Sequence, residues 1–143
     1  MSEDTIIPRD HYNYLWRISW LSLFTSLYAA KQGHYDLAFV PGGIFLTSIN
    51  YWRNPNYSWR RTLDINYVRL ALAYQVYRAY KSQYSSMYYA ITTGAVACYP
   101  IAIYYYKQNQ LWKSVYFHSM IHILGNVSNV ILYSDEQLSL PKN

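Results

Sequence analysis

The stretch that decides the fold is residues 111–133, LWKSVYFHSMIHILGNVSNVILY. A helix over these residues is apolar for most of its length and long enough to cross a bilayer. His118 and His122 are four residues apart, so they share one face of that helix. A polar group at membrane depth is costly unless it is paired, ligated or hydrated. The stretch therefore predicts a spanning helix whose two imidazoles meet a polar partner.

The composition of the whole chain agrees with a membrane environment. Of its 143 residues, 52% are hydrophobic, 20% are aromatic and only 13% are charged. The mean hydropathy of -0.15 looks low for a membrane protein, but the 19 tyrosines account for this because the scale treats tyrosine as polar. Tyrosine and tryptophan favour the interfaces of a bilayer. We therefore expect a lipid bilayer around this protein.

Charge and cysteine content limit further which kind of protein this chain can be. The net charge is +5, but the basic residues are scattered in ones and twos, which fits lipid headgroups and argues against a nucleic-acid partner. The lone Cys98 cannot form a disulfide within the chain. The acidic residues 1–10 do not resemble a signal peptide, so we expect the first apolar helix to act as an uncleaved anchor.

Five segments are candidates for membrane spans, so the expected fold is an all-α, polytopic integral membrane helix bundle in one domain, residues 1–143. Pro41-Gly42-Gly43 should kink or delay the second helix, which leaves four spans if that segment is re-entrant. Short polar links force neighbouring helices to run antiparallel. Residues 134–143 read as a polar tail that frays. The expected spans are 14–30, 37–52, 63–80, 87–106 and 111–133.

The distribution of lysine and arginine predicts the orientation. Seven basic residues fall on the side of the N-terminus and four on the other side, which places the N-terminus in the cytosol. The sequence does not indicate which membrane. The first group is Arg9, Arg17, Arg53, Arg60, Arg61, Lys107 and Lys113, and the second is Lys31, Arg78, Lys81 and Lys142.

This topology brings several polar side chains to one depth near the cytosolic face. Ser48 lies near the end of the second span, Asp64 begins the third, and the two histidines lie two to three turns into the fifth. Asp64 follows Arg60 and Arg61 by three or four residues, so a local ion pair is the simplest expectation for its carboxylate.

Two imidazoles at this spacing can bind one zinc ion, and a nearby carboxylate can orient a zinc-bound water. A zinc site needs a third protein ligand, for which the candidates are Asp64 and His11. Alternatively, His118 and His122 hydrogen-bond to Asp64, Asn50, tyrosine hydroxyls or water and fix the packing of the helices. We favour this second interpretation.

The order Ser48-x-x-x-Trp52, Asp64 and His118-x-x-x-His122 resembles the motif layout of the alkaline ceramidase and progestin/adiponectin receptor superfamily. That family has Ser-x-x-x-His at the end of its second helix, an Asp at the start of the third and His-x-x-x-His in the last. The resemblance implies an intramembrane zinc amidase, with His118 and His122 as metal ligands and with Asp64 and Ser48 in supporting catalytic roles.

The chain departs from that family at two points. Trp52 stands where the third zinc-binding histidine belongs, and an indole ring cannot bind zinc. Five expected spans replace the family's seven. The loss of the third ligand at Trp52 favours a descendant without catalytic activity.

We therefore expect a small multi-pass membrane protein with a structural or accessory role. Its expected partners are other membrane protein subunits or further copies of itself, and no cofactor is required. One alternative is a zinc-dependent intramembrane lipid amidase. A second alternative is a small transporter or lipid-binding protein that uses Asp64, His118 and His122 as a proton relay.

Overall fold

The computed structural model describes residues 5–138, and it confirms the expected all-α class. No strand occurs in this part of the chain. The helices are α1 (Arg9–Ile18), α2 (Leu21–Lys31), α3 (Tyr35–Trp52), α4 (Trp59–Ala79), α5 (Ser85–Lys107), α6 (Leu111–Tyr133) and the short 3-10 helix η1 (Glu136–Leu138).

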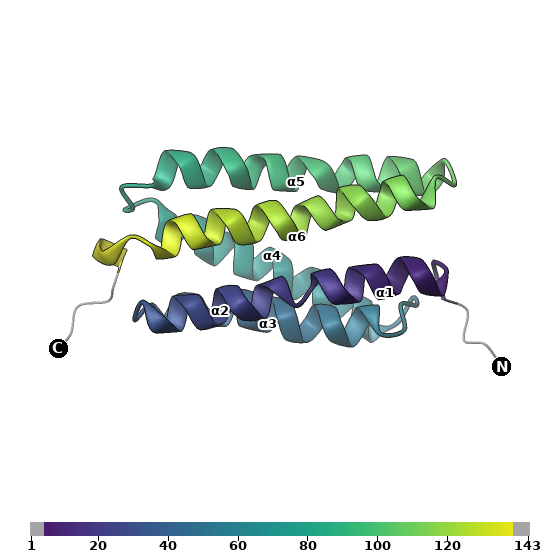
Figure 1. Cartoon of the computed structure of the whole chain (residues 1–143), viewed down its shortest axis with the longest axis horizontal. Helices are drawn as coiled ribbons and strands as arrows, with labels where there is room; N and C mark the ends of the chain where they lie inside the picture. The colour runs from purple at the N-terminus through teal and green to yellow at the C-terminus, as the bar shows by residue number, and fades with distance from the viewer. Residues whose placement is uncertain (1–4, 139–143) are drawn as a thin grey trace.

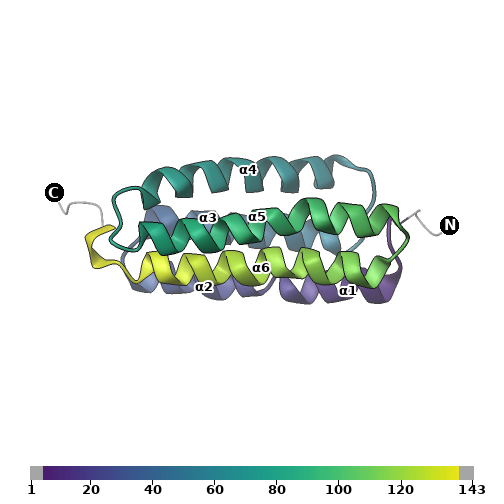
Figure 2. The same cartoon turned by 90° about the horizontal axis from the view of Figure 1, so that it is seen from above.

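The helices run alternately up and down along one long axis, with α1 and α2 following each other in one direction (Figure 1). Helix α5 packs along α6, and α2 packs along both α3 and α6. Helix α4 packs mainly on α3 and forms one edge of the bundle, opposite α1 and α2 (Figure 2).

The two ends of this bundle differ in the segments that they contain. At the first, called the basic end here, residues 5–8 meet loops 53–58 and 108–110. The Ile6 N–H donates to the Pro55 carbonyl at 3.0 Å. The Tyr106 hydroxyl, in the last turn of α5, donates to the Ile6 carbonyl at 3.2 Å. The other, called the C-terminal end, contains residues 32–34, 80–84 and 134–138.

The first expected span is two helices rather than one. The break falls at Ser19 and Trp20, where the Trp20 N–H bonds to the Arg17 carbonyl at 3.2 Å, three residues back. The Ser19 hydroxyl donates to the Leu15 carbonyl at 2.8 Å, a local bond that bends helices. The tightened turn and this bond together explain the interruption.

The expected delay at Pro41 is wrong, because α3 begins at Tyr35 and continues through the proline. Pro41 has no N–H to donate to the Leu37 carbonyl. Hydroxyls from three other helices bond to the carbonyls at this point of α3. Ser26 donates to Ala38 at 2.7 Å, Tyr67 donates to Phe39, and the Tyr133 hydroxyl lies 3.4 Å from the Leu37 carbonyl.

The two glycines after Pro41 allow this close approach. A Cβ atom at Gly42 would lie 2.8 Å from the Ser26 hydroxyl, and one at Gly43 would overlap the phenol of Tyr67. Pro41-Gly42-Gly43 is therefore the place where α2 and α4 come close to α3.

Buried apolar side chains form a cluster at each end of the bundle. The tail was expected to fray from residue 134, but Asp135 is fully buried and Leu138 belongs to the cluster at the C-terminal end. Residues 139–143 of that expected tail lie outside the described residues. The first cluster is Ile7, Leu15, Tyr51, Trp52 and Val115, and the second is Ala29, Leu37, Ala79, Tyr88, Leu132, Tyr133 and Leu138.

By length and hydropathy, one helix within residues 5–138 could cross a membrane, and it is α6. This is the helix formed by the stretch from Leu111 to Tyr133. Only 28% of its most apolar window is buried inside the bundle.

We predict that Gly43→Ala destabilises the fold while Gly94→Ala does not. The methyl group at position 43 displaces Tyr67 from α3, and overpacking of this kind lowers the free energy of unfolding by about 1–3 kcal/mol. A Cβ at Gly94 meets nothing within 4 Å, so alanine there only improves helix propensity. Unfolding in mild detergent, followed by circular dichroism, measures both variants. Equal stability of the two variants would contradict the proposed close approach.

Candidate functional site

The structure brings together most of the polar residues that the sequence placed at one depth. Asp64, in the second turn of α4, is buried against α3. One of its oxygens, Oδ1, accepts hydrogen bonds from the Ser48 hydroxyl at 2.9 Å and from the Thr47 hydroxyl at 2.7 Å. Two donors on one oxygen hold the carboxylate in place. Ser48 and Asp64 are therefore direct partners.

The expected ion pair between Asp64 and the preceding arginines does not form in the described part of the chain. The Arg60 guanidinium bonds to the carbonyls of Asn50 and Asn54 at 3.3 and 3.0 Å, which ties α4 to the loop before it. Arg61 instead lies over the ring of Tyr57, at 5.4 Å from the ring centroid.

The two imidazoles lie side by side on α6, with ring centroids 5.5 Å apart. His122 is buried, and His118 is half-buried with its ring edge-on to Trp52 at 5.1 Å. Within residues 5–138 neither imidazole forms a hydrogen bond, so their expected bonds to Asp64, Asn50 or tyrosine hydroxyls are not made. Ring contacts with Trp52 and with each other position them instead.

A pocket of about 160 Å³ opens beside these residues at the basic end. Asp64, His118 and Trp52 line it, together with Arg61 and an otherwise mainly aromatic and aliphatic wall. The indole N–H of Trp52 is buried without a hydrogen-bond partner in residues 5–138. The pocket thus combines a fixed carboxylate, an imidazole and a free indole donor.

The residues present do not fit a protein zinc site. Over the described range, no three His, Cys, Asp or Glu side chains are grouped closely enough to hold a metal ion. His11, a candidate third ligand, packs on the ring of Trp112 with centroids 4.2 Å apart. Trp52 lies against His118, and indole offers no ligand atom. The Ser48 hydroxyl is bonded to Asp64 and not to an imidazole base, so it is not arranged as an activated nucleophile.

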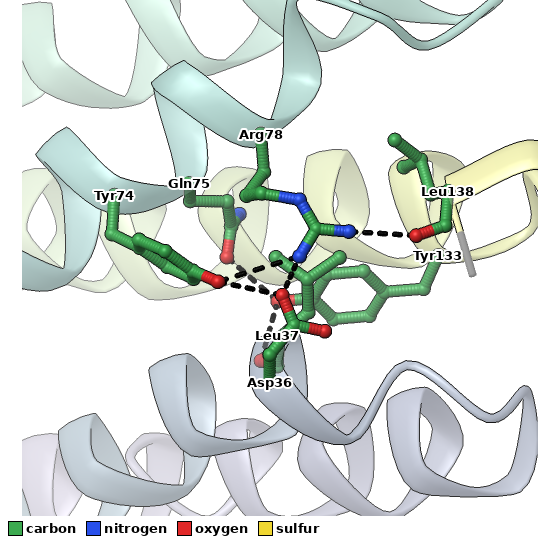
Figure 3. Close-up of polar contacts among 7 residues, drawn as sticks. All are labelled: Asp36, Leu37, Tyr74, Gln75, Arg78, Tyr133 and Leu138. Atoms are coloured by element: carbon green, nitrogen blue, oxygen red, sulfur yellow. Dashed lines mark hydrogen bonds and ion pairs between the residues drawn. The ribbon is translucent and has the colours of Figure 1, made fainter. Parts of the chain in front are cut away.

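A second polar cluster, which the sequence reasoning missed, lies at the C-terminal end (Figure 3). Asp36, in the first turn of α3, forms an ion pair with Arg78 near the end of α4. The Tyr74 hydroxyl donates to the same Asp36 oxygen at 2.6 Å. Arg78 also donates to the Leu138 carbonyl at 2.6 Å. This cluster joins the start of α3, the end of α4 and η1.

Gln75 extends this cluster into the interior of the bundle. Its side chain is buried, and its carbonyl oxygen accepts a hydrogen bond from the Tyr133 hydroxyl at 2.7 Å (Figure 3). Its amide group donates to the Tyr88 hydroxyl at 3.2 Å and to the Asn129 carbonyl oxygen. One amide thereby connects α4 with α5 and α6. We call these four residues the Gln75 network.

His34 also belongs to this end of the molecule. It is buried, and its Nε2 lies 3.0 Å from the Tyr133 carbonyl. A carbonyl can only accept, so Nε2 carries the proton. The bond satisfies one of the free carbonyls at the end of α6.

Two sequence signals point to these residues. Asp36 immediately precedes one expected span and Arg78 lies near the end of the next, and antiparallel neighbours bring such positions to the same end. Ala71, Gln75 and Ala79 recur every four residues, and all three are buried. A glutamine on the small-residue face of an apolar helix is a sign that it has a partner across the interface.

We predict that the role of Asp64 is to accept hydrogen bonds. Asp64→Ala removes the acceptor of the Ser48 hydroxyl and leaves the Thr47 hydroxyl only the Ile44 carbonyl at 3.3 Å, and the free energy of unfolding falls by about 1–3 kcal/mol. Asp64→Asn keeps an acceptor oxygen and loses less. Chemical unfolding in detergent measures the difference. A wild-type stability for Asp64→Ala would show that these bonds contribute nothing.

Asp135 gives a prediction for pH. Its burial raises the pKa of the carboxyl group, but hydrogen bonds from the Ser82 hydroxyl and from the backbone N–H groups of Gln137 and Gln83 outweigh this and lower the pKa below the ordinary value. These bonds measure 2.6, 3.0 and 2.9 Å. Because the folded-state pKa is the lower one, the carboxylate adds stability above the unfolded-state pKa of about 3.9.

This contribution is lost as the pH falls through the folded-state pKa. We therefore expect the melting temperature of the wild type to fall more steeply below about pH 4 than that of Asp135→Asn. The exposed neighbour provides a matched control, since Glu136→Gln should keep the wild-type slope. Identical slopes for the wild type and Asp135→Asn would be incompatible with the buried, bonded carboxylate.

Comparison with family models, with curated proteins and with solved structures gives no match for this chain.

Proposed function

We propose that this chain is a small multi-pass membrane protein that serves as a structural or accessory subunit of a larger membrane assembly. One observation carries the proposal. Between the two apolar clusters at its ends, the bundle buries mostly small and polar side chains along α2, α5 and α6 and exposes large apolar ones on the same helices. This is the reverse of the pattern in a protein that folds in water.

Helix α6 illustrates this reversal. Its buried residues include Ser119, His122, Asn126, Ser128 and Asn129. The large apolar side chains that it exposes are Trp112, Tyr116, Met120, Val127 and Val130. A helix at the core of a soluble protein would present the second set inward.

Helices α2 and α5 follow the same rule. The buried residues of α2 are Ser22, Thr25 and Ala29, while Leu21, Phe24 and Leu27 are exposed. Along α5, Thr92, Ala95 and Ala102 are buried next to exposed Val96, Ile101 and Ile103. Small residues that let helices approach, with hydroxyls and amides bonded between helices, are typical of membrane bundles.

The lengths of the long helices suit a bilayer. Helices α4, α5 and α6 have 21, 23 and 23 residues, which corresponds to about 32–35 Å at 1.5 Å per residue. Polar residues on the inner faces and the many tyrosines lower the mean hydropathy of these helices. A bundle that satisfies its own polar groups tolerates such helices in lipid.

The charges support one orientation. Arg9, Arg53, Lys107 and Lys113 lie at or near the basic end, as do Arg60 and Arg61. The C-terminal end carries Lys31, Arg78 and Lys81 together with the acidic residues Asp36, Asp135 and Glu136. Cytosolic loops are enriched in lysine and arginine, so we infer that the basic end faces the cytosol.

Two features favour an accessory role over a zinc hydrolase or a proton relay. The polar site near the basic end is incomplete for either chemistry, and the surface of α4 exposes polar groups. The polar residues present do not fit a zinc hydrolase. A proton relay needs hydrogen bonds between Asp64 and the imidazoles, and none is made among residues 5–138. Meanwhile α4 exposes Asn66 and Arg69 on an otherwise apolar surface. Such groups require a protein partner in the membrane.

We predict that labelling from one side of intact membranes distinguishes the two ends. In a Cys98→Ser background, Ser86→Cys at the C-terminal end reacts with a membrane-impermeant maleimide added from the non-cytosolic side. Gln108→Cys at the basic end reacts only after permeabilisation. Labelling of both positions without permeabilisation would exclude a spanning bundle.

The oligomeric state and stability of the purified chain test the accessory role. In mild detergent we expect it to be oligomeric or unstable when alone, because the surface that would pack against other subunits lacks its partners. A stable, monodisperse monomer in sedimentation experiments would contradict a subunit role but not membrane insertion.

A further inference from the structure

The outward face of α4 carries a repeating pattern. Seven exposed residues recur at alternating intervals of four and three, the spacing of the a and d positions in a helix that packs lengthwise against another helix. We call this row the α4 seam. It consists of Trp59, Leu63, Asn66, Leu70, Ala73, Tyr77 and Tyr80.

No other part of residues 5–138 covers the α4 seam. The inner face of α4 packs on α3, and the helix forms the edge of the bundle away from α1, α2 and α6 (Figure 2). A groove runs along the first half of this outer face. It is lined by Trp59, Thr62, Leu63, Asn66, Tyr67 and Leu70.

Arg69 flanks the α4 seam at its midpoint. It lies ten residues from each end of α4, so it is about 15 Å from either end of the helix. It is exposed, and no acidic side chain in the described range pairs with it. A guanidinium at the middle of a bilayer is costly unless it meets an acceptor. A position beside the seam is where charges between paired helices select the partner.

We propose that the α4 seam binds a transmembrane helix of a different protein, and that this helix carries a carboxylate beside Arg69. The proposal rests on the membrane-subunit function above and names the chemistry of its partner. Seam residues supply apolar packing, and the Arg69–carboxylate pair supplies selectivity.

A second copy of this chain does not meet the requirement. The only acidic residue on α4 is Asp64, which is buried against α3 and bonded to Thr47 and Ser48. Two seams packed in parallel would bring two Arg69 side chains together with no carboxylate between them. Two acids at the C-terminal end are already engaged, since Asp36 is paired with Arg78 and Asp135 is bonded to Ser82 and Gln83.

Synthetic helices test the proposal with the full chain in liposomes. The probes are three fluorescent transmembrane peptides of leucine and alanine, about 23 residues long, whose central residue is Glu, Gln or Leu. Energy transfer from the labelled chain reports binding. We expect the Glu peptide to bind about tenfold more tightly than the Leu peptide, as a polar contact of 1–2 kcal/mol in the membrane implies.

Variants of the chain assign the effect to Arg69. Arg69→Leu abolishes the preference for the Glu peptide, and Arg69→Lys retains part of it. Arg17→Leu, which removes an exposed arginine from α1, leaves the preference unchanged. Equal binding of all three peptides, or a preference that persists in Arg69→Leu, overturns the proposal. Self-association that depends on Arg69 overturns it in favour of a second copy.

The failure of this inference is distinguishable from the failure of the proposed function. A chain that resists alkaline extraction from the liposomes but shows no preference among the peptides remains a membrane protein without this partner. A chain released by alkaline extraction contradicts both.

Discussion

The rest of the structure depends on one constraint: the polar side chains buried along α4 must find hydrogen-bond partners on the neighbouring helices. The Gln75 network meets this constraint for α4, α5 and α6, since its buried amide is bonded to Tyr88, Asn129 and Tyr133. Ser48 and Thr47 meet it for Asp64, which lies on the same buried face of α4 nearer the basic end. The hydrogen bonds of Gln75 and those of Asp64 together fix the rotation of α4 about its own axis. That rotation leaves the α4 seam and Arg69 facing outward.

Helix α3 provides the surface on which this bundle is assembled. Its carbonyls around Pro41 accept hydrogen bonds from hydroxyl groups of α2 and α4, for which its two glycines make room, and the Tyr133 hydroxyl of α6 lies 3.4 Å from the Leu37 carbonyl. A proline that removes one donor from a helix thus leaves an acceptor for a neighbouring helix. The same segment that weakens the helix locally therefore strengthens its contacts with three others.

The sequence was sufficient to predict the all-α class and the approximate bounds of the long helices, because apolar length and polar links are local signals. It also predicted that Ser48 and Asp64 meet, since consecutive antiparallel helices leave few alternatives. The partners of Gln75, Tyr133 and His34 could not be derived in the same way. They depend on how each helix is rotated about its axis, which is set by non-local packing. The expected delay at Pro41 failed for the same reason, because the hydroxyls that bond to α3 beside the proline come from other helices.

The central claim is that the apolar outer face of this bundle contacts hydrocarbon. Spin labels at neighbouring positions of α5 test it most directly, because Ala95 is 3% exposed and Val96 is 48% exposed. In liposomes, with Cys98 replaced by serine, a nitroxide at Val96→Cys should collide often with oxygen and rarely with a water-soluble nickel chelate. A label at Ala95→Cys should collide rarely with both. Frequent collision of the Val96 label with the nickel chelate would place this face in water and contradict the account.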